Sequence, residues 1–250
     1  KDVVNRLGDD PAAGMVVPQK TGLPALDVAL GIGGLPKGRL INCWGQEGGG
    51  KSLLADIVAA QVQRDGGNVA VIDVEHKWSV ALLAGLNVDD IEYIRPPSAE
   101  AALDICHSLV YDREKKEVRK IYDLIIFDSV AALITEGEME ADQGTSHIAP
   151  IARSMAEHCK KMVHALSFSG CIAFYINQLR SKPLTMYGNP YKPTGGKALH
   201  FFCTIELEVK NKPIKEGGLV VGMSGEISVK KNQVAPPFRE ASFEFHYEKG

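Results

Sequence analysis

The sequence predicts an α/β domain in which a mainly parallel, twisted sheet is flanked by helices, with antiparallel strands at its C-terminal end. Three observations lead to this prediction. Short apolar runs alternate with longer amphipathic ones, as strands alternate with helices in such domains. A glycine-rich segment at residues 45–50 separates one such strand from a helix. The last fifty residues instead alternate polar and apolar side chains, as antiparallel strands do.

The expected elements follow one another along the chain. Four short, almost wholly apolar runs predict strands buried on both faces: 40–44, 68–74, 122–127 and 171–176. Apolar residues at helical spacing predict helices at 51–64, 99–111 and 148–167. The charged run 112–120 is expected to end in solvent. Alternating strands are expected at 204–209, 226–231 and 242–247.

Residues 181–196 contain three prolines and three glycines without clear periodicity. They predict a long loop, and long loops inside compact domains are usually functional or disordered. Neither a repeat nor a dividing linker is visible in the sequence. We therefore expect a single domain over residues 1–250, with 1–38 as an N-terminal segment that leads into the first buried strand.

The composition excludes several other classes of protein. The chain has 250 residues, 45% of them hydrophobic and 24% charged, which suits one large soluble domain. No apolar run reaches the roughly 18 residues that a membrane-spanning helix needs, and residues 1–5 do not begin a signal peptide. The five cysteines are scattered without metal-ligand spacing. We expect reduced, largely core-packed thiols in a cytoplasmic protein without membrane partners.

Charge is unevenly distributed along the chain. The net charge is −3, yet residues 158–205 contain no Asp or Glu. A local basic surface can therefore exist on an acidic molecule, although a chance gap in acidic residues around two buried elements would give the same pattern. The basic residues of this stretch are Lys160, Lys161, Arg180, Lys182, Lys192 and Lys197.

Residues 45–52 match the phosphate-binding pattern G-x-x-x-x-G-K-[ST] at every fixed position, after a strand and before a helix. Glycines let backbone N–H groups wrap phosphate oxygens, and the helix adds its positive N-terminal end. Lys51 is expected to reach the β- and γ-phosphates of ATP, and the Ser52 hydroxyl to bind Mg²⁺. The predicted nucleotide-binding residues here are Gly45, Gln46, Glu47, Gly48, Gly49, Gly50, Lys51, Ser52 and Leu53.

Polar side chains end three other predicted strands. Asp128 follows an apolar strand, and beside a phosphate loop its natural partner is the Mg²⁺ shell. Glu75 ends the strand that follows the phosphate-loop helix and is a candidate to orient and activate the attacking water. Gln178 ends a further strand, where an amide could sense the γ-phosphate or simply terminate the strand. Asp73 and His76 are interpreted as structural.

Together these residues resemble the RecA recombinase family over essentially the whole chain. Each motif is short, but the set occurs in order and at near-family spacing. The carrying segments are residues 6–8, 21–27, 31–39, the phosphate loop, 72–76, 128–133, 176–180, 188–190, 194–199, 230–232 and 237–238.

The resemblance implies a RecA-like ATPase core that polymerises head to tail on single-stranded DNA and binds ATP between subunits. It implies pairing with a homologous duplex and strand exchange. Glu75 matches the family's catalytic glutamate, and Lys231 matches a residue that reaches the nucleotide. Gln178 matches the residue that links the γ-phosphate to the second DNA-binding loop. Residues 136–148 match the first DNA-binding loop and residues 179–196 match the second. Phe201 matches a subunit contact. The expected DNA-binding residues are Ile148, Arg153, Lys160, Arg180, Lys182, Pro183, Leu184, Met186, Asn189, Gly195 and Gly196.

The sequence departs from the family pattern at several places. Gln233 stands where the family usually has a lysine that reaches the neighbour's ATP. The tyrosine expected to stack on adenine is missing, with Trp78 as a substitute. The first DNA loop is unusually acidic. We also expect this chain to be the core alone, without the family's N-terminal oligomerisation helix and C-terminal domain.

Two other functions share this core. A regulatory paralogue would bind ATP and DNA without hydrolysis; Glu75 and Lys51 count against it, while Gln233 favours it. A hexameric helicase would form a closed ring rather than an open filament. The Asn189-Pro190 pair and the Thr-Gly-Gly run of residues 194–196 favour the recombinase.

Overall fold

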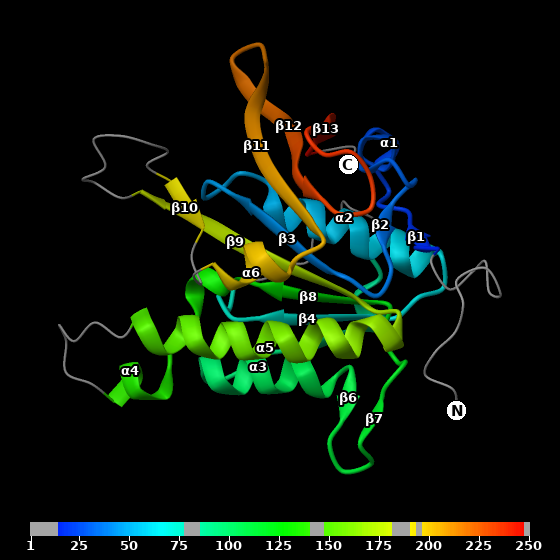
Figure 1. The fold of residues 1–250 in the computed structure, drawn as a ribbon. Coiled ribbons are helices and arrows are strands. Elements are labelled where there is room, and N and C mark those ends of the chain that lie inside the picture. The colour runs from blue at the N-terminus through cyan, green and yellow to red at the C-terminus, as the bar shows by residue number, and fades with distance from the viewer. Residues whose placement is uncertain (1–14, 78–85, 141–147, 182–190, 194–196, 248–250) are drawn as a thin grey trace.

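One mixed sheet forms the centre of the molecule (Figure 1). The structure is a computed structural model that describes residues 15–77, 86–140, 148–181, 191–193 and 197–247. Within these, the strand order is β13-β12-β11-β3-β9-β8-β4-β5, and β10 pairs with β9. The strands are β3 (Leu40–Gly45), β4 (Val69–Asp73), β5 (Ile91–Ile94), β8 (Leu124–Asp128), β9 (Ile172–Ser181), β10 (Tyr191–Pro193), β11 (Ile205–Glu216), β12 (Leu219–Asn232) and β13 (Glu240–His246).

The sheet changes from parallel to antiparallel at β11. Strands β3, β9, β8, β4 and β5 pair in parallel, while β12 pairs antiparallel with both β11 and β13. The predicted antiparallel nature of 204–209 is therefore only half right, because β11 also pairs in parallel with β3. The crossover through the preceding helix brings β11 back in the direction of β3, as such connections do.

Helices cover both faces of the sheet, which explains why the central strands are apolar throughout. On one face α1 (Pro24–Leu30) and α2 (Lys51–Arg64) enclose a core that includes Ile41 and Val71. On the other face α3 (Ala99–Ser108), α5 (Ile148–Ser169) and α6 (Ala198–Phe202) cover a core that includes Leu40 and Phe127. Figure 1 shows α3 and α5 side by side beneath the sheet.

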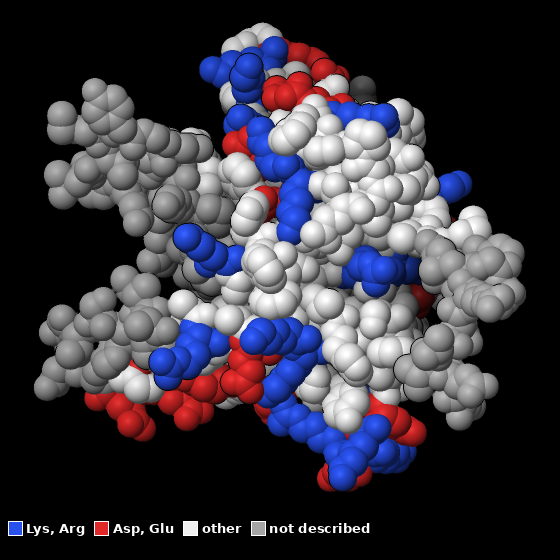
Figure 2. Space-filling model, viewed as in Figure 1, with Lys and Arg blue, Asp and Glu red and all other residues white. Residues whose placement is uncertain are grey.

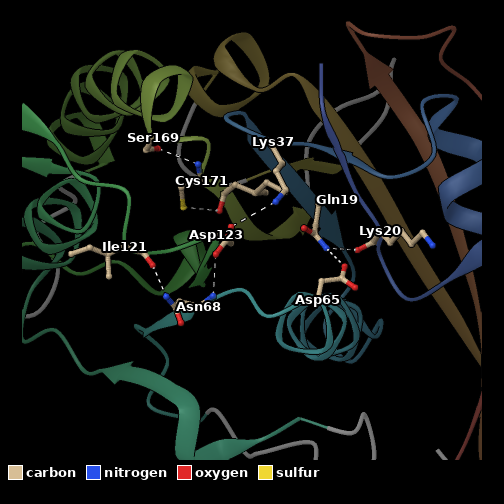
Figure 3. Close-up of polar contacts among 10 residues, drawn as sticks. Gln19, Lys20, Lys37, Asp65, Asn68, Ile121, Asp123, Ser169 and Cys171 are labelled. Atoms are coloured by element: carbon tan, nitrogen blue, oxygen red, sulfur yellow. Dashed lines mark hydrogen bonds and ion pairs between the residues drawn. The ribbon is translucent and has the colours of Figure 1, made fainter. Parts of the chain in front are cut away.

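A polar network fixes the amino ends of the parallel strands (Figure 3). The Asp123 carboxylate, just before β8, accepts a hydrogen bond from the backbone N–H of Asn68, just before β4, at 3.1 Å. It also lies 3.7 Å from the Lys37 ammonium group, close to the start of β3. The Asn68 side chain donates to the carbonyl of Ile121 at 2.9 Å. This edge is held by structural contacts, so chemistry is expected at the opposite, carboxyl edge.

Several elements differ from the sequence prediction. The charged run 112–120 includes most of a small antiparallel hairpin, and β11 and β12 continue as one long hairpin well beyond the predicted strands. Part of the predicted loop 181–196 pairs with β9 as β10. The elements without a predicted counterpart are β1 (Pro18–Gln19), β2 (Leu35–Pro36), β6 (Tyr111–Asp112), β7 (Glu117–Val118), α4 (Glu136–Glu140), η2 (Val88–Asp90) and η3 (Val130–Ala132), together with α1, β5 and α6.

The described residues also bear on the predicted class of protein. No helix among them is long and apolar enough to cross a membrane. All five cysteines are buried and unbridged, as expected for core-packed thiols. Burial raises the pKa of Cys43, Cys106, Cys159 and Cys203 to about 12, so these thiols stay protonated and unreactive at neutral pH.

Candidate nucleotide site

The phosphate loop lies between β3 and α2 at the carboxyl edge of the sheet, as its sequence predicts. Gly45 must be glycine because a Cβ there would lie 2.2 Å from the carbonyl oxygen of Val209 on β11. Gly50, at the N-terminus of α2, has a φ of 88°, a conformation that side chains with a Cβ rarely adopt. The loop thus turns tightly and directs the first N–H groups of α2 outward, which suits a phosphate.

Lys51 folds back over this loop. Its ammonium group donates to the carbonyl oxygens of Gln46 at 2.7 Å and Gly45 at 3.4 Å, and the residue is buried. Burial lowers the pKa of Lys51, while the nearby negative charges of Asp128 and Glu75 act in the opposite direction. A poorly solvated cation held among phosphate-loop carbonyls is suited to bind an anion, which would replace the hydration that burial removes.

Ser52 and Asp128 form the second part of the site. The Ser52 hydroxyl donates to the Asp128 carboxylate at 2.7 Å, which joins α2 to the end of β8. Burial raises the pKa of Asp128 to about 6, with the charges of Glu75 and Asp73 adding to the effect and the Ser52 hydrogen bond opposing it. A hydroxyl and a carboxylate among several negative charges form an oxygen-rich donor set, which fits Mg²⁺.

Glu75 and Gln178 are brought together although 103 positions separate them in the chain. The Gln178 amide donates to Oε1 of Glu75 at 2.6 Å. Glu75 follows β4 and Gln178 lies on β9, with β8 between these strands in the sheet. The prediction that Gln178 ends its strand is wrong, because β9 continues to Ser181, while its predicted role at the γ-phosphate stays a prediction. A carboxylate and an amide in hydrogen-bond contact can orient a water molecule together.

Ser129 was not among the predicted site residues, yet its hydroxyl donates to the same Oε1 of Glu75 at 2.5 Å. Its position directly after Asp128 is the signal in the sequence that could have indicated it. Asp73, interpreted as structural, has a partner that its sequence position does not reveal. The Tyr93 hydroxyl donates to the Asp73 carboxylate at 2.6 Å, and Arg95 donates to that hydroxyl at 3.0 Å. These contacts tie the end of β4 to the edge strand β5.

Two of the predicted DNA-binding residues have described side chains. Arg153 and Lys160 are exposed on α5, seven residues apart and hence on one face of the helix. Figure 2 shows basic side chains over the layer of α3 and α5, and acidic ones at the end where α4 lies. Ile148 and Arg180 lie in α5 and β9. The remaining residues lie outside the described part of the chain: Lys182, Pro183, Leu184, Met186, Asn189, Gly195 and Gly196, as does the proposed adenine contact Trp78.

Lys231 lies with α6 rather than with the phosphate loop. Its ammonium group donates to the carbonyl oxygens of His200 at 2.7 Å and Phe201 at 3.1 Å, so it caps the end of this short helix. The neighbouring Phe201 side chain is 73% exposed. Among the contacts described, Lys231 makes none with the phosphate loop of its own subunit, and its expected contact with a nucleotide stays a prediction.

Comparison with known proteins identifies relatives along the entire chain. The family model described as the RecA N-terminal domain matches residues 1–250. Protein RecA of Herpetosiphon aurantiacus is 40% identical across 100% of this chain, which covers 68% of that protein. Protein RecA of Geobacter metallireducens is 38% identical, with 73% of its length covered, and that of Clostridioides difficile is 39% identical, with 70% covered.

Proposed function

The chain belongs to the RecA family of recombinases, which act in DNA recombination and repair, and we propose that it is a DNA-dependent ATPase that forms a helical filament on single-stranded DNA. ATP with Mg²⁺ is the proposed cofactor, and a homologous duplex is the proposed second substrate. The observation that carries the proposal is the contact of Glu75 with Gln178 beside a complete phosphate loop.

Nucleotide binding follows from the phosphate loop and the residues around it. Lys51 turns from the loop carbonyls to the β- and γ-phosphates, and the N–H groups at the start of α2 hold phosphate oxygens. Ser52 and Asp128 would hold Mg²⁺, which when bound neutralises charge that develops on the phosphates. The raised pKa of Asp128 supports this assignment, because a buried carboxylate surrounded by other acids gains most from a cation.

Hydrolysis requires a water molecule in line with the γ-phosphate. Glu75 orients this water and draws its proton as it attacks. Gln178 contacts Glu75 from β9, the strand that leads directly into the predicted second DNA loop. A change in that loop on DNA binding can therefore move the amide and alter the water site, which couples DNA binding to turnover.

DNA binding is assigned to basic residues on α5 and at the end of β9. Arg153 and Lys160 on α5, with Arg180 and Lys182 near the second loop, would contact phosphates. Phosphate contacts carry no sequence information. Binding without sequence preference is what a search for homology requires, since base pairing must then distinguish the strands.

The test is ATP turnover of the protein with and without single-stranded DNA of several unrelated sequences. We expect a strong rise with every sequence, followed by strand exchange with a homologous duplex. An ATP turnover rate that does not change on addition of DNA would refute the coupling between DNA binding and hydrolysis. ATP and DNA binding without hydrolysis would instead favour a regulatory paralogue, and closed rings in electron micrographs would favour a helicase.

A further inference from the structure

One oxygen of Glu75 receives two hydrogen bonds at once. The Ser129 hydroxyl lies 2.5 Å from Oε1, and the Gln178 amide nitrogen lies 2.6 Å from the same atom. A carboxylate oxygen has two lone pairs in its plane, so both acceptor directions of Oε1 are occupied. Among the described residues, no donor reaches Oε2.

The two donors come from different strands of the sheet. Ser129 is fully buried and follows β8. The loop that carries Glu75 is bound to this same strand end, because the N–H groups of Val74 and Glu75 donate to the Asp128 carbonyl at 2.7 and 3.3 Å. Ser129 and Glu75 are thus fixed to one another through backbone as well as side chain. Gln178 instead lies on β9, where it pairs with Gly45 of β3, and it directly precedes the predicted second DNA loop.

We propose that Ser129 is a positioning residue for ATP hydrolysis: it holds Oε1 of Glu75 so that Oε2 receives the attacking water. The inference rests on the function proposed above. Gln178 adds a second, adjustable hydrogen bond to Oε1, while Ser129 supplies the constant one. When the amide moves, the carboxylate keeps its orientation, because the serine hydroxyl still holds it.

A structural serine would behave differently. If Ser129 only filled space at the end of β8, its hydroxyl would contribute to folding independently of Glu75, and its loss would leave the kinetic constants of the folded protein unchanged. If it acts through Glu75, the effects of changing the two residues are not additive. The two roles are therefore distinguished by removing the Ser129 hydroxyl once in the presence of the Glu75 carboxylate and once in its absence.

The experiment compares Ser129→Ala in the wild-type and Glu75→Ala backgrounds. Ser228→Ala is the matched control, since this buried serine on β12 also donates to a carboxylate, that of Glu240 at 3.4 Å. Turnover is measured with saturating single-stranded DNA and divided by the fraction of protein that binds a fluorescent ATP analogue, so that partial unfolding does not count as lost turnover. Thermal unfolding is measured without nucleotide.

We expect Ser129→Ala to lower kcat about tenfold while the KM for ATP changes less than about twofold, as for an interaction made in the transition state. It should lower Tm by roughly 4 °C in the wild-type background and leave Tm unchanged in Glu75→Ala. Ser228→Ala should leave kcat unchanged. Ser129→Cys, which retains a weaker donor in nearly the same volume, should give an intermediate kcat.

Three results would overturn the inference. These are full kcat in Ser129→Ala, full kcat in Ser129→Cys if the alanine variant does not fold, and an equal loss of Tm in both backgrounds. The two kinetic results presuppose a wild-type protein that hydrolyses ATP. Absence of turnover in the wild type would instead overturn the proposed function, and the catalytic role of Ser129 with it.

Discussion

His158 lies at the centre of a buried polar chain, and this position predicts how stability depends on pH. Its Nε2 lies 2.6 Å from the Tyr175 hydroxyl, which in turn lies 3.4 Å from the Cys106 sulfur. A hydrogen bond to the backbone of Leu103 occupies the other side of the ring. Because the Leu103 carbonyl can only accept, Nδ1 carries the proton and Nε2 accepts from Tyr175. The network is therefore satisfied by the neutral imidazole.

Burial lowers the pKa of His158 from 6.5 to about 3, and the positive charges of His107 and Lys161 add to the effect. The unfolded chain takes up a proton below pH 6.5, whereas the folded protein does not until pH 3. The neutral His158 side chain therefore makes its full contribution to the free energy of unfolding above pH 6.5, and this contribution is lost as the pH falls below 6.5. At pH 5 the loss is about 2 kcal/mol, since each pH unit below 6.5 costs about 1.4 kcal/mol.

The perturbation is His158→Gln, which removes the titrating group and keeps a neutral hydrogen-bonding side chain. Urea unfolding is measured between pH 7.5 and 5, beside His164→Gln, which replaces an exposed histidine on the same helix. We expect His158→Gln to lower the free energy of unfolding by about 1–3 kcal/mol at pH 7.5. On acidification to pH 5, the free energy of unfolding of this variant should fall by about 2 kcal/mol less than that of the wild type. An equal pH dependence in His158→Gln and wild type would refute the reasoning.

Three further changes test the nucleotide and DNA sites. Lys51→Ala should abolish hydrolysis, and measured turnover in that variant would contradict the phosphate assignment. Gly45→Ala should destabilise the protein by about 2–4 kcal/mol in urea unfolding, because its Cβ would overlap a backbone carbonyl of β11. An unchanged urea midpoint would show that β11 moves away without cost and would contradict this expectation. Replacing Arg180 and Lys182 together by alanine should flatten the salt dependence of single-strand binding by a slope of about 1.4, and an unchanged slope would place the DNA elsewhere.

The candidate nucleotide site could be proposed from sequence because the phosphate loop, Asp128 and Glu75 lie at or just after the carboxyl ends of strands. The glycine pattern before Lys51 specifies a backbone conformation, and an apolar run ending in Asp128 specifies a strand and its terminus. Sequence reasoning needed only the rule that parallel strands meet with their carboxyl ends at one edge. It left the role of Gln178 open, since no local pattern shows which strand lies two places away in the sheet.

Elements that lack apolar periodicity were not predicted. The hairpin of β6 and β7 lies in a run of alternating charges, and its short strands carry no apolar periodicity. Strands β11 and β12 extend into a region where both lose their buried face, so the alternation on which the prediction depends disappears there. Ser129 was missed for a related reason, because a serine after a strand is common and only the three-dimensional position of Glu75 gives it a partner.

The order of strands brings residues from three adjacent strands together at one site. The loops that carry Asp128 and Glu75 follow adjacent strands, β8 and β4, and are bonded to one another through backbone. Gln178 lies on β9, which flanks β8 on the other side and continues past the site into the predicted DNA loop. Under the proposed function, a signal from DNA would reach Glu75 through the hydrogen bond from Gln178, while the Asp128 carbonyl holds the backbone of Val74 and Glu75. In that proposal regulation acts through β9 and catalysis through β4 and β8, so DNA would change the rate without disrupting the contacts between Asp128 and Glu75.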